Sequence, residues 1–538
     1  LPVLAGRIVG SPETADRFLY DYRKTLADCL ALNHYGRFRE LCHRHGVLLH
    51  TEGGGPCTAV PPMDALRNLG QNDVPMGEFW HSGHWKRDGQ NDVGKQTASA
   101  AHTYGKRFAA AEAFTSMGPH WEEGPADLKP AADIAFCEGI NRCFLHTSTL
   151  SPPEAGTPGQ EYFAGTHFNA NITWWEQASA WLDYLSRCQF LLSEGLPAAD
   201  VCFYYGDHAP NFAAPKAAGP DLGPGYDYDV CDADVLLRRM RVVDGRIVLP
   251  DGVGYRLLAL PERKSMPVEV LRKLKALVEA GATVIGPKPA RAAGLHGYPE
   301  SDALVRRLAG ELWGPCDGAS VTEHRAGKGR IVWGRTPQEV LQADGVGPDF
   351  AWAGGGDGTF LDFIHRSLEG TEIYFVANRR DRAEEVACSF RVSGRRPELW
   401  DPVTGAIREA RAFSQSSGRT EVPLRLAPHG SIFVVFREPI ARDAAGAGRR
   451  NWRVEGPPHA IAGPWTVRFD PAWGGPEEAV FDELVDWTAH PDLRVRFYSG
   501  TATYATTFDL PADLRGGSGR IALDLGDVKT LAEVRLNG

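Results

Sequence analysis

The first 195 residues repeat one pattern: an amphipathic stretch, a short apolar run, and then a polar loop rich in Gly or aromatic residues. Apolar spacing of the helical kind covers 13–32, whereas the apolar runs at 47–52 and 108–115 have the length of strands. A further helical stretch at 130–141 precedes the run at 143–148. We therefore predict alternating helices and strands, with a polar loop after each strand.

Four of these strand ends carry an ionisable side chain. Glu52, Glu78, Glu112 and His146 are separated by 26, 34 and 34 residues, about the length of one βα unit. Four such units form half of a (β/α)8 barrel, a fold whose reactive groups lie at the carboxyl ends of the strands. A doubly wound sheet gives the same alternation, but no Gly-x-Gly-x-x-Gly fingerprint follows a strand. We favour the barrel, with its remaining strands upstream of Leu1.

The pattern changes twice after residue 195. Residues 196–345 alternate short apolar strands with amphipathic helices, which predicts a small α/β, Rossmann-like accessory domain. Strands then dominate, which predicts a β-sandwich at 346–445 and a second, truncated one at 446–538. The expected fold is multidomain α/β plus β, with the C-terminal half of a catalytic (β/α)8 barrel at 1–195. We expect both ends of the chain to be truncated.

Composition narrows the functional classes. The chain has 538 residues, 43% hydrophobic and 23% charged, as in ordinary globular domains. Its 58 Lys and Arg against 68 Asp and Glu leave a net charge of -10, without the cationic footprint that nucleic-acid binding needs. No run approaches the roughly 20 apolar residues of a membrane-spanning helix. The ten cysteines show no CxxC pair, which predicts buried free thiols.

The three carboxylates are the strongest chemical signal. Glu112 lies inside the apolar run 108–114, so its carboxylate is desolvated unless it faces a polar cavity. A carboxylate at the mouth of a barrel acts as general acid, general base or metal ligand, although a single one is more often a solvated or ion-paired group. Oxygen donors suit a hard cation such as calcium. A zinc site is less favoured, because His81 and His84 have no evident third ligand.

Aromatic side chains accompany these acids. Phe79, Trp80, Trp85 and Trp121 are interleaved with histidines. Sugars present apolar faces that stack on indoles and hydroxyls that pair with polar groups, so this composition favours a carbohydrate site. Ordinary packing at the barrel rim is the alternative.

A polar segment precedes the last helical stretch of this region. His167, Asn169 and Asn171 alternate, so an extended segment would point all three toward a hydroxylated ligand. Thr173 and Glu176 have the spacing of a capping box, which predicts a helix over 173–194.

Several of these segments resemble one known family. The chain resembles the α-L-rhamnosidases of glycoside hydrolase family 106 over most of its length, and the motif around Glu78 is fairly specific. The closing stretch is similar to the sugar-binding β-sandwich of glycoside hydrolase family 2. The segments that carry the family 106 resemblance are Thr-Glu-Gly-Gly-Gly-Pro at 51–56, Asp-Val-Pro-Met-Gly-Glu-Phe-Trp at 73–80, Ala-Glu-Ala-Phe-Thr at 111–115, the segment 167–175, and Pro-Glu-Leu-Trp-Asp-Pro with Thr-Gly at 397–405.

The resemblance implies an inverting, usually calcium-assisted hydrolase that removes terminal α-L-rhamnose from oligo- or polysaccharides. It places the general base at Glu112 and a second essential carboxylate, in the sugar or calcium shell, at Glu78. The family's acid lies on an earlier strand, for which this chain has no counterpart. As it stands, the segment is expected to lack its acid and half its barrel, which would leave it inactive by itself. The residues expected to contact the substrate are Glu52, His84, Trp85, His167, Asn169 and Asn171.

Two other functions remain open. One is another glycosidase, such as a galactosidase, on a similar barrel, and the other is a non-catalytic carbohydrate-binding fragment. Enzymes that resemble this one are typically exported to the periplasm or cell surface of bacteria, so we expect that location. The sequence does not specify the aglycone, the linkage or the oligomeric state.

Overall fold

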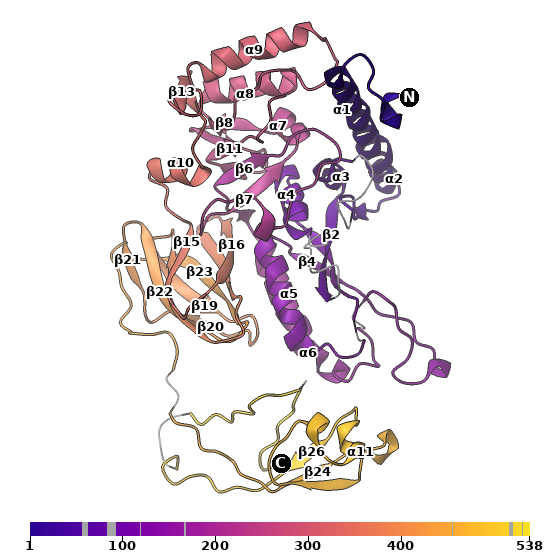
Figure 1. Ribbon diagram of the computed structural model, residues 1–538. Coiled ribbons are helices and arrows are strands. Elements are labelled where there is room, and N and C mark those ends of the chain that lie inside the picture. Colours follow the sequence, from indigo (N-terminus) through magenta and orange to yellow (C-terminus); the bar gives the residue numbers. More distant parts are fainter. Residues whose placement is uncertain are drawn as a thin grey trace. The chain divides into compact units, whose positions relative to one another are not determined.

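The computed structural model describes residues 1–55, 63–82, 93–118, 120–165, 168–453, 456–515, 520–529 and 531–538. The chain forms two compact units, whose course Figure 1 shows. The first comprises Leu1–Leu150, Gln160–Phe168 and Ser179–Asn451, and the second comprises Ser151–Gly159, Asn169–Ala178 and Trp452–Gly538. No helix within the described ranges is both long and apolar enough to cross a membrane.

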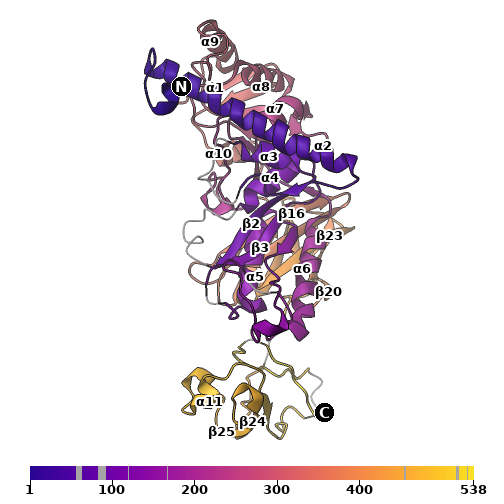
Figure 2. The same ribbon diagram turned by 90° about the vertical axis from the view of Figure 1, so that its right-hand side faces the viewer.

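The first unit begins with helices that alternate with strands, as the apolar pattern predicts. Ser11 opens the first helix by accepting the Thr14 N–H, and Pro12 occupies the first turn, where no backbone donor is needed. In Figure 2 this helix continues through a π turn into the next as one long rod. The elements are α1 (Pro12–Cys29), the π turn η2 (Leu30–Gly36), α2 (Arg37–Arg44), β1 (His50–Thr51), α3 (Ala65–Gln71), β2 (Val74–Ser82), α4 (Gly94–Tyr104), β3 (Ala110–Ser116), α5 (Pro125–Glu138), β4 (Arg142–Leu145) and α6 (Ala178–Leu192).

The four strands form one curved parallel sheet in the order β1-β2-β3-β4. His50 of β1 and Phe144 of β4 belong to the two edge strands, yet their rings stack with centroids 4.2 Å apart. The predicted succession of four strands is therefore confirmed, and the curvature is what a barrel wall requires. Closure of this sheet into a (β/α)8 barrel with further strands stays a prediction.

A six-stranded sheet of order β13-β14-β12-β11-β6-β7 follows, parallel except for β13. Apolar faces of α8 and α9 pack on it through a core that includes Leu271, Leu274 and Trp313. Its elements are β6 (Val201–Tyr204), β7 (Tyr228–Cys231), α7 (Ala233–Arg238), β11 (Leu257–Ala259), α8 (Val268–Ala280), β12 (Thr283–Ile285), α9 (Glu300–Trp313), β13 (Glu323–Ala326), β14 (Gly329–Val332) and α10 (Pro337–Ala343). A small antiparallel sheet adds β8 (Arg241–Val243), β9 (Arg246–Val248) and β10 (Gly254–Tyr255).

The first unit ends in two antiparallel sheets, β15-β18-β22-β21 and β20-β19-β23-β17-β16-β5. Alternating residues such as Phe350, Tyr374, Phe390 and Phe436 fill the core between them. The strands are β5 (Leu196–Pro197), β15 (Phe350–Gly354), β16 (Leu361–Leu368), β17 (Thr371–Asn378), β18 (Glu384–Phe390), β19 (Arg395–Trp400), β20 (Ile407–Glu409), β21 (Ser414–Ser416), β22 (Arg419–Leu426) and β23 (Ser431–Pro439).

The second unit has a small core of its own around Val467, Phe469 and Phe481. Its antiparallel sheet has the order β25-β24-β26. The elements are β24 (Trp465–Arg468), β25 (Glu478–Phe481), α11 (Leu493–Arg496) and β26 (Thr503–Ala505). The chain is thus multidomain, with α/β segments followed by β segments, as predicted.

A buried ion pair and a buried histidine–carboxylate contact fix α4 against the six-stranded sheet. On α4, the Lys95 ammonium lies 2.9 Å from Asp227 and the His102 imidazole lies 2.8 Å from Asp229 of β7. All four side chains are buried. Removing one member of such a pair leaves an uncompensated buried charge at a cost of about 3–5 kcal/mol, so α4 is held firmly in place.

Two more detailed predictions concern the start of α6 and the state of the cysteines. The helix predicted over 173–194 begins only at Ala178, after a 3-10 turn at Trp175–Gln177, so the capping box at Thr173 and Glu176 is wrong. The nine cysteines within the described ranges are all free and six of them are buried, which confirms the expected free thiols.

One buried histidine makes the stability of the β-sandwich part depend on pH. Protonated His365 donates through Nδ1 to Asp349 at 2.8 Å and through Nε2 to Glu372 at 2.9 Å. Burial by itself would lower the pKa of His365, but the two carboxylates outweigh it and raise the pKa to about 9. The protonated ring therefore stabilises the fold fully below its unfolded pKa of about 6.5, and this contribution, about 3 kcal/mol, is lost as pH rises through 9.

We expect the melting temperature of the first unit to fall between pH 6.5 and pH 9.5, as followed by calorimetry. The His365→Gln variant would melt lower at pH 6.5 but show a much smaller fall, because its amide does not titrate. Equal pH dependence in both proteins would contradict this role of His365.

Candidate active site

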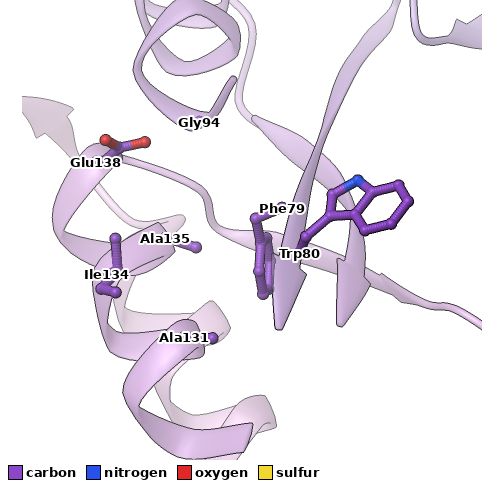
Figure 3. A pocket seen from close by; sticks show the side chains of 7 residues that line it. All are labelled: Phe79, Trp80, Gly94, Ala131, Ile134, Ala135 and Glu138. Carbon is purple, nitrogen blue, oxygen red and sulfur yellow. The ribbon is translucent and has the colours of Figure 1, made fainter. Parts of the chain in front are cut away.

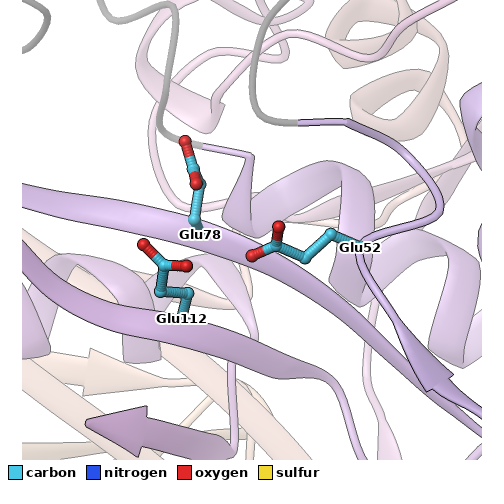
Figure 4. A group of neighbouring side chains, drawn as sticks. All are labelled: Glu52, Glu78 and Glu112. Carbon is cyan, nitrogen blue, oxygen red and sulfur yellow. The ribbon is translucent and has the colours of Figure 1, made fainter. Parts of the chain in front are cut away.

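Three carboxylates converge on one face of the parallel sheet (Figure 4). Glu78 of β2 and Glu112 of β3 are register partners, and Glu52 directly follows β1. Because partners in parallel strands point to the same face, strand pairing itself brings the two acids together. One oxygen from each of the three carboxylates lies within 4.8 Å of the others. The structure thus unites the three glutamates. Glu78 and Glu112, however, lie within β2 and β3 and not at the strand ends that the sequence predicted.

This arrangement concentrates negative charge at a site that is partly shielded from solvent. Two unit charges about 5 Å apart repel by roughly 3 kcal/mol at an effective dielectric constant of about 20. Glu78 is only 4% exposed, and Oε1 of Glu52 is buried without a hydrogen-bond partner. Burial, and then the charge of Glu112, raise the pKa of Glu52 to about 7. A proton on Glu52 or a bound cation would relieve the repulsion.

Neighbouring hydrogen-bond donors orient the carboxylates of Glu78 and Glu112. Trp80 Nε1 donates to Oε1 of Glu78 at 2.9 Å. The Thr115 hydroxyl donates to Oε1 of Glu112, and His146 Nδ1 lies 3.7 Å from the same oxygen. Glu112 therefore has a fixed oxygen, while its side chain keeps 23% of its surface exposed to solvent.

A bulge in β3 creates the contact between Thr115 and Glu112. Phe79 pairs with Ala113 but Trp80 pairs with Thr115, so Phe114 is an extra residue in β3. Its φ of 71° lies in the left-handed region, which costs a non-glycine residue about 1–2 kcal/mol. The ring of Phe114 is fully buried, 5.0 Å from that of Phe79. Strict alternation would have put Thr115 on the opposite face from Glu112, so the bulge moves a hydroxyl donor onto the side of the acids.

Close packing of α4 supports Glu78 from behind. A Cβ on Gly77 would lie 2.3 Å from Oγ1 of Thr97 and 2.7 Å from Cγ2 of Val93. Only a glycine lets α4 approach β2 this closely, directly beside Glu78. The position of Glu78 thus depends on α4 and on the buried ion pairs that hold it.

A small cavity lies beside Phe79 (Figure 3). Its volume is about 10 Å³, and Phe79 faces alanine side chains of α5 across it. The carboxylate of Glu138, at its edge, accepts the backbone N–H groups of Lys95 and Lys216. Because none of Glu52, Glu78 and Glu112 lines this cavity, it is a packing space and not part of the acidic site. Its lining residues are Phe79, Trp80, Gly94, Ala131, Ile134, Ala135 and Glu138.

The other residues expected to contact the substrate are only partly described by the structure. His84, Trp85 and His167 lie outside the described residues. Asn169 and Asn171 belong to the second unit, where Asn169 Oδ1 accepts the Asn171 N–H at 2.9 Å and the Ile172 N–H closes a turn on the Asn169 carbonyl. The segment turns at Asn169 and is not extended there, so the condition under which alternating side chains point one way is not met, and the role of both amides toward a ligand stays a prediction.

Sequence reasoning overlooked two features near Glu112. One is Thr115, which only the bulge brings to the acid. The other is the aromatic pair Tyr162 and Phe163, whose first ring contacts His146 edge-on with centroids 5.5 Å apart. A Tyr-Phe pair in a loop rich in Gly and Pro was the available signal, but its nearness to Glu112 is a matter of tertiary structure.

A family model matches most of the chain. The model of glycoside hydrolase family 106, described as alpha-L-rhamnosidase, matches residues 1–415. A curated relative from Formosa agariphila, provisionally named a beta-glucuronidase, is 36% identical over 438 residues, which cover 81% of this chain and 35% of the relative. The solved structure of a rhamnosidase from Novosphingobium sp. PP1Y has a TM-score of 0.83 and 33% identity, covering 95% of this chain and 48% of that one.

The chain thus spans about a third of the curated relative and about half of the solved rhamnosidase. All three convergent glutamates, Thr115 and His146 fall within the matched residues. By this match the chain belongs to glycoside hydrolase family 106, the α-L-rhamnosidases.

Proposed function

We propose that the complete protein cleaves terminal α-L-rhamnosyl residues from glycans with inversion, and that Glu112 is its general base. The observation that carries this proposal is the convergence of three carboxylates from adjacent parallel strands on one face of the sheet, in a chain of this family. Glu112 is the best placed of the three to activate water, because its side chain is partly exposed and one oxygen is held by Thr115.

The three acids do not supply both partners of an inverting pair. Inverting carboxyl groups are roughly 6.5 to 9.5 Å apart, so that a water molecule fits between base and sugar. One oxygen from each of Glu52, Glu78 and Glu112 lies within 4.8 Å of the other two, which is closer than this spacing. In this proposal the cluster provides the base and its charged surroundings, and the general acid is a different residue.

The same cluster fits a divalent cation such as calcium. Calcium takes oxygen ligands, several of them carboxylates, and the buried unpartnered oxygen of Glu52 is a free donor atom. When bound, calcium would supply positive charge that offsets the acids and helps to orient sugar hydroxyls. Glu78 and Glu52 would hold it, with Trp80 fixing one oxygen of Glu78.

A retaining glycosidase is the second candidate. The two carboxyl groups of retaining enzymes are roughly 5 to 5.5 Å apart, close to the spacing in this cluster. A curated relative of this chain is provisionally named a beta-glucuronidase, which is a different glycosidase activity. The anomeric configuration of the first product, followed by NMR during hydrolysis, separates the two: β-L-rhamnose from an α-L-rhamnoside supports inversion, and the α anomer supports retention.

We expect Glu112→Gln in the complete gene product to lower kcat on 4-nitrophenyl α-L-rhamnoside by at least about a hundredfold, because the amide cannot accept a proton from water. Circular dichroism should show an unchanged fold. Glu122→Gln is the matched control, since Glu122 is exposed and lies ten residues along the chain. Near-normal turnover by Glu112→Gln would refute the assignment of the base.

We expect added calcium to raise the melting temperature of the EDTA-treated protein, because a ligand that binds only the native state stabilises it. The rise should be lost in a Glu52→Gln, Glu78→Gln double variant, which keeps the side-chain shapes but removes two charges. A calcium-independent melting temperature in the unaltered protein would exclude this site.

We expect Thr115→Val to lower kcat about tenfold through loss of the hydrogen bond that fixes Glu112, with a smaller effect on KM. Thr115→Ser keeps the hydroxyl and should restore most of the activity. Equal loss in the two variants would show that Thr115 acts by packing instead.

A further inference from the structure

One imidazole lies against the residues that hold Glu112. His146 directly follows β4, and its backbone N–H donates to the Ala113 carbonyl of β3 at 3.0 Å. Its ring atom Nδ1 lies 3.4 Å from Oγ1 of Thr115 and 3.7 Å from Oε1 of Glu112. Neither the family match nor the proposed function assigns this imidazole a role.

The hydrogen bonds around Thr115 determine which nitrogen of His146 carries a proton. A general base is ionised in the resting enzyme, so Glu112 only accepts, and the single hydroxyl proton of Thr115 goes to its Oε1. The Thr115 oxygen then has no proton left for His146 and can only accept one from it. Nδ1 of His146 is therefore protonated in the neutral ring as well as in the imidazolium.

The charge of Glu112 favours the same arrangement. With its proton on Nδ1, the ring directs a donor toward two oxygen acceptors, one of them a carboxylate. The opposite tautomer would place a nitrogen lone pair beside that carboxylate, and this nitrogen would compete with Glu112 for the Thr115 proton.

The surrounding loop holds the His146 ring in place. A Cβ on Gly165 would lie 3.0 Å from Nδ1, so the glycine lets the loop lie directly against this edge of the ring. The ring of Tyr162 meets it edge-on with centroids 5.5 Å apart. Directly after His146, the Thr147 carbonyl accepts the Phe168 N–H at 3.0 Å. Nδ1 is thus oriented before any substrate binds, so the contact costs little ordering during the reaction.

We propose that His146 is a positioning residue for the general base: its Nδ1–H donates to Thr115, and Thr115 in turn donates to Glu112. This inference rests on the proposed function. Without the imidazole, the Thr115 hydroxyl is free to rotate and give its proton to water, and the carboxylate of Glu112 loses its fixed orientation. The distance of 3.4 Å is long for a hydrogen bond, as is common for catalytic contacts before substrate binds. His146 therefore acts on kcat through Glu112 and not on substrate affinity.

The test uses side chains that replace only one nitrogen of the ring, in the complete gene product. In His146→Asn the amide nitrogen takes the place of Nδ1, whereas in His146→Gln it reaches the place of Nε2. We expect His146→Leu and His146→Gln to lower kcat on 4-nitrophenyl α-L-rhamnoside about fivefold with KM nearly unchanged, because one hydrogen bond is lost. His146→Asn should retain most of the activity. Circular dichroism checks that all three variants keep the fold.

A double variant separates positioning from packing. In the Thr115→Val background the chain of hydrogen bonds is already broken, so His146→Leu should lower kcat no further. A ring that mattered only for packing would cost the same factor with and without the Thr115 hydroxyl. Equal losses in the two backgrounds, or equal losses in His146→Asn and His146→Gln, would overturn the inference.

A second readout does not depend on hydrolysis. If the unaltered complete protein hydrolyses no rhamnoside, the proposed function fails separately, and melting temperatures are compared for the unaltered protein, His146→Leu, Thr115→Val and the double variant. A decrease caused by His146→Leu that disappears in the Thr115→Val background supports the hydrogen-bonded chain. Equal decreases in both backgrounds, or a decrease in neither, overturn it.

Discussion

The close approach of three carboxylates is the constraint on which the rest of this part of the structure depends. Their mutual repulsion opposes folding, so the strands that carry them must be held by other interactions. The register of β2 and β3 places Glu78 beside Glu112, and the opposite face of these strands packs Phe79 against Phe114. Apolar burial on one side of the sheet thus sustains a charged, reactive surface on the other.

The support extends well beyond the parallel strands. Helix α4 touches β2 at Gly77, beside Glu78, and its far side carries Lys95 and His102 to carboxylates at β7. The six-stranded sheet therefore acts as a rigid backing for the acidic site. Removing one partner from the buried pairs with α4 is destabilising. The sheet therefore helps to fix the position of Glu78, although none of the three clustered acids lies on it.

Backbone strain at Phe114 shapes the same region of the structure. Phe114 adopts a left-handed backbone conformation that a phenylalanine rarely occupies, and the burial of its ring offsets the cost. The resulting bulge turns Thr115 toward Glu112. In the proposed role of Glu112 as general base, such a fixed donor keeps its reactive oxygen from sampling unproductive orientations.

The sequence by itself determined the alternation of helices and strands, the family, and the choice of Glu52, Glu78 and Glu112 as candidate site residues. These features follow from local apolar periodicity and short motifs. The prediction was wrong where the tertiary structure overrode local rules: the helix expected over 173–194 starts at Ala178, and Glu78 and Glu112 lie within β2 and β3 instead of at their ends. Only the tertiary structure decided that the three acids meet within 4.8 Å, that Glu52 keeps a buried unpartnered oxygen, and that Thr115 and Tyr162 lie near Glu112 or its neighbour His146. Such contacts depend on strand register, one bulge and loop anchoring, which join residues far apart in the chain and leave no periodic trace in the sequence.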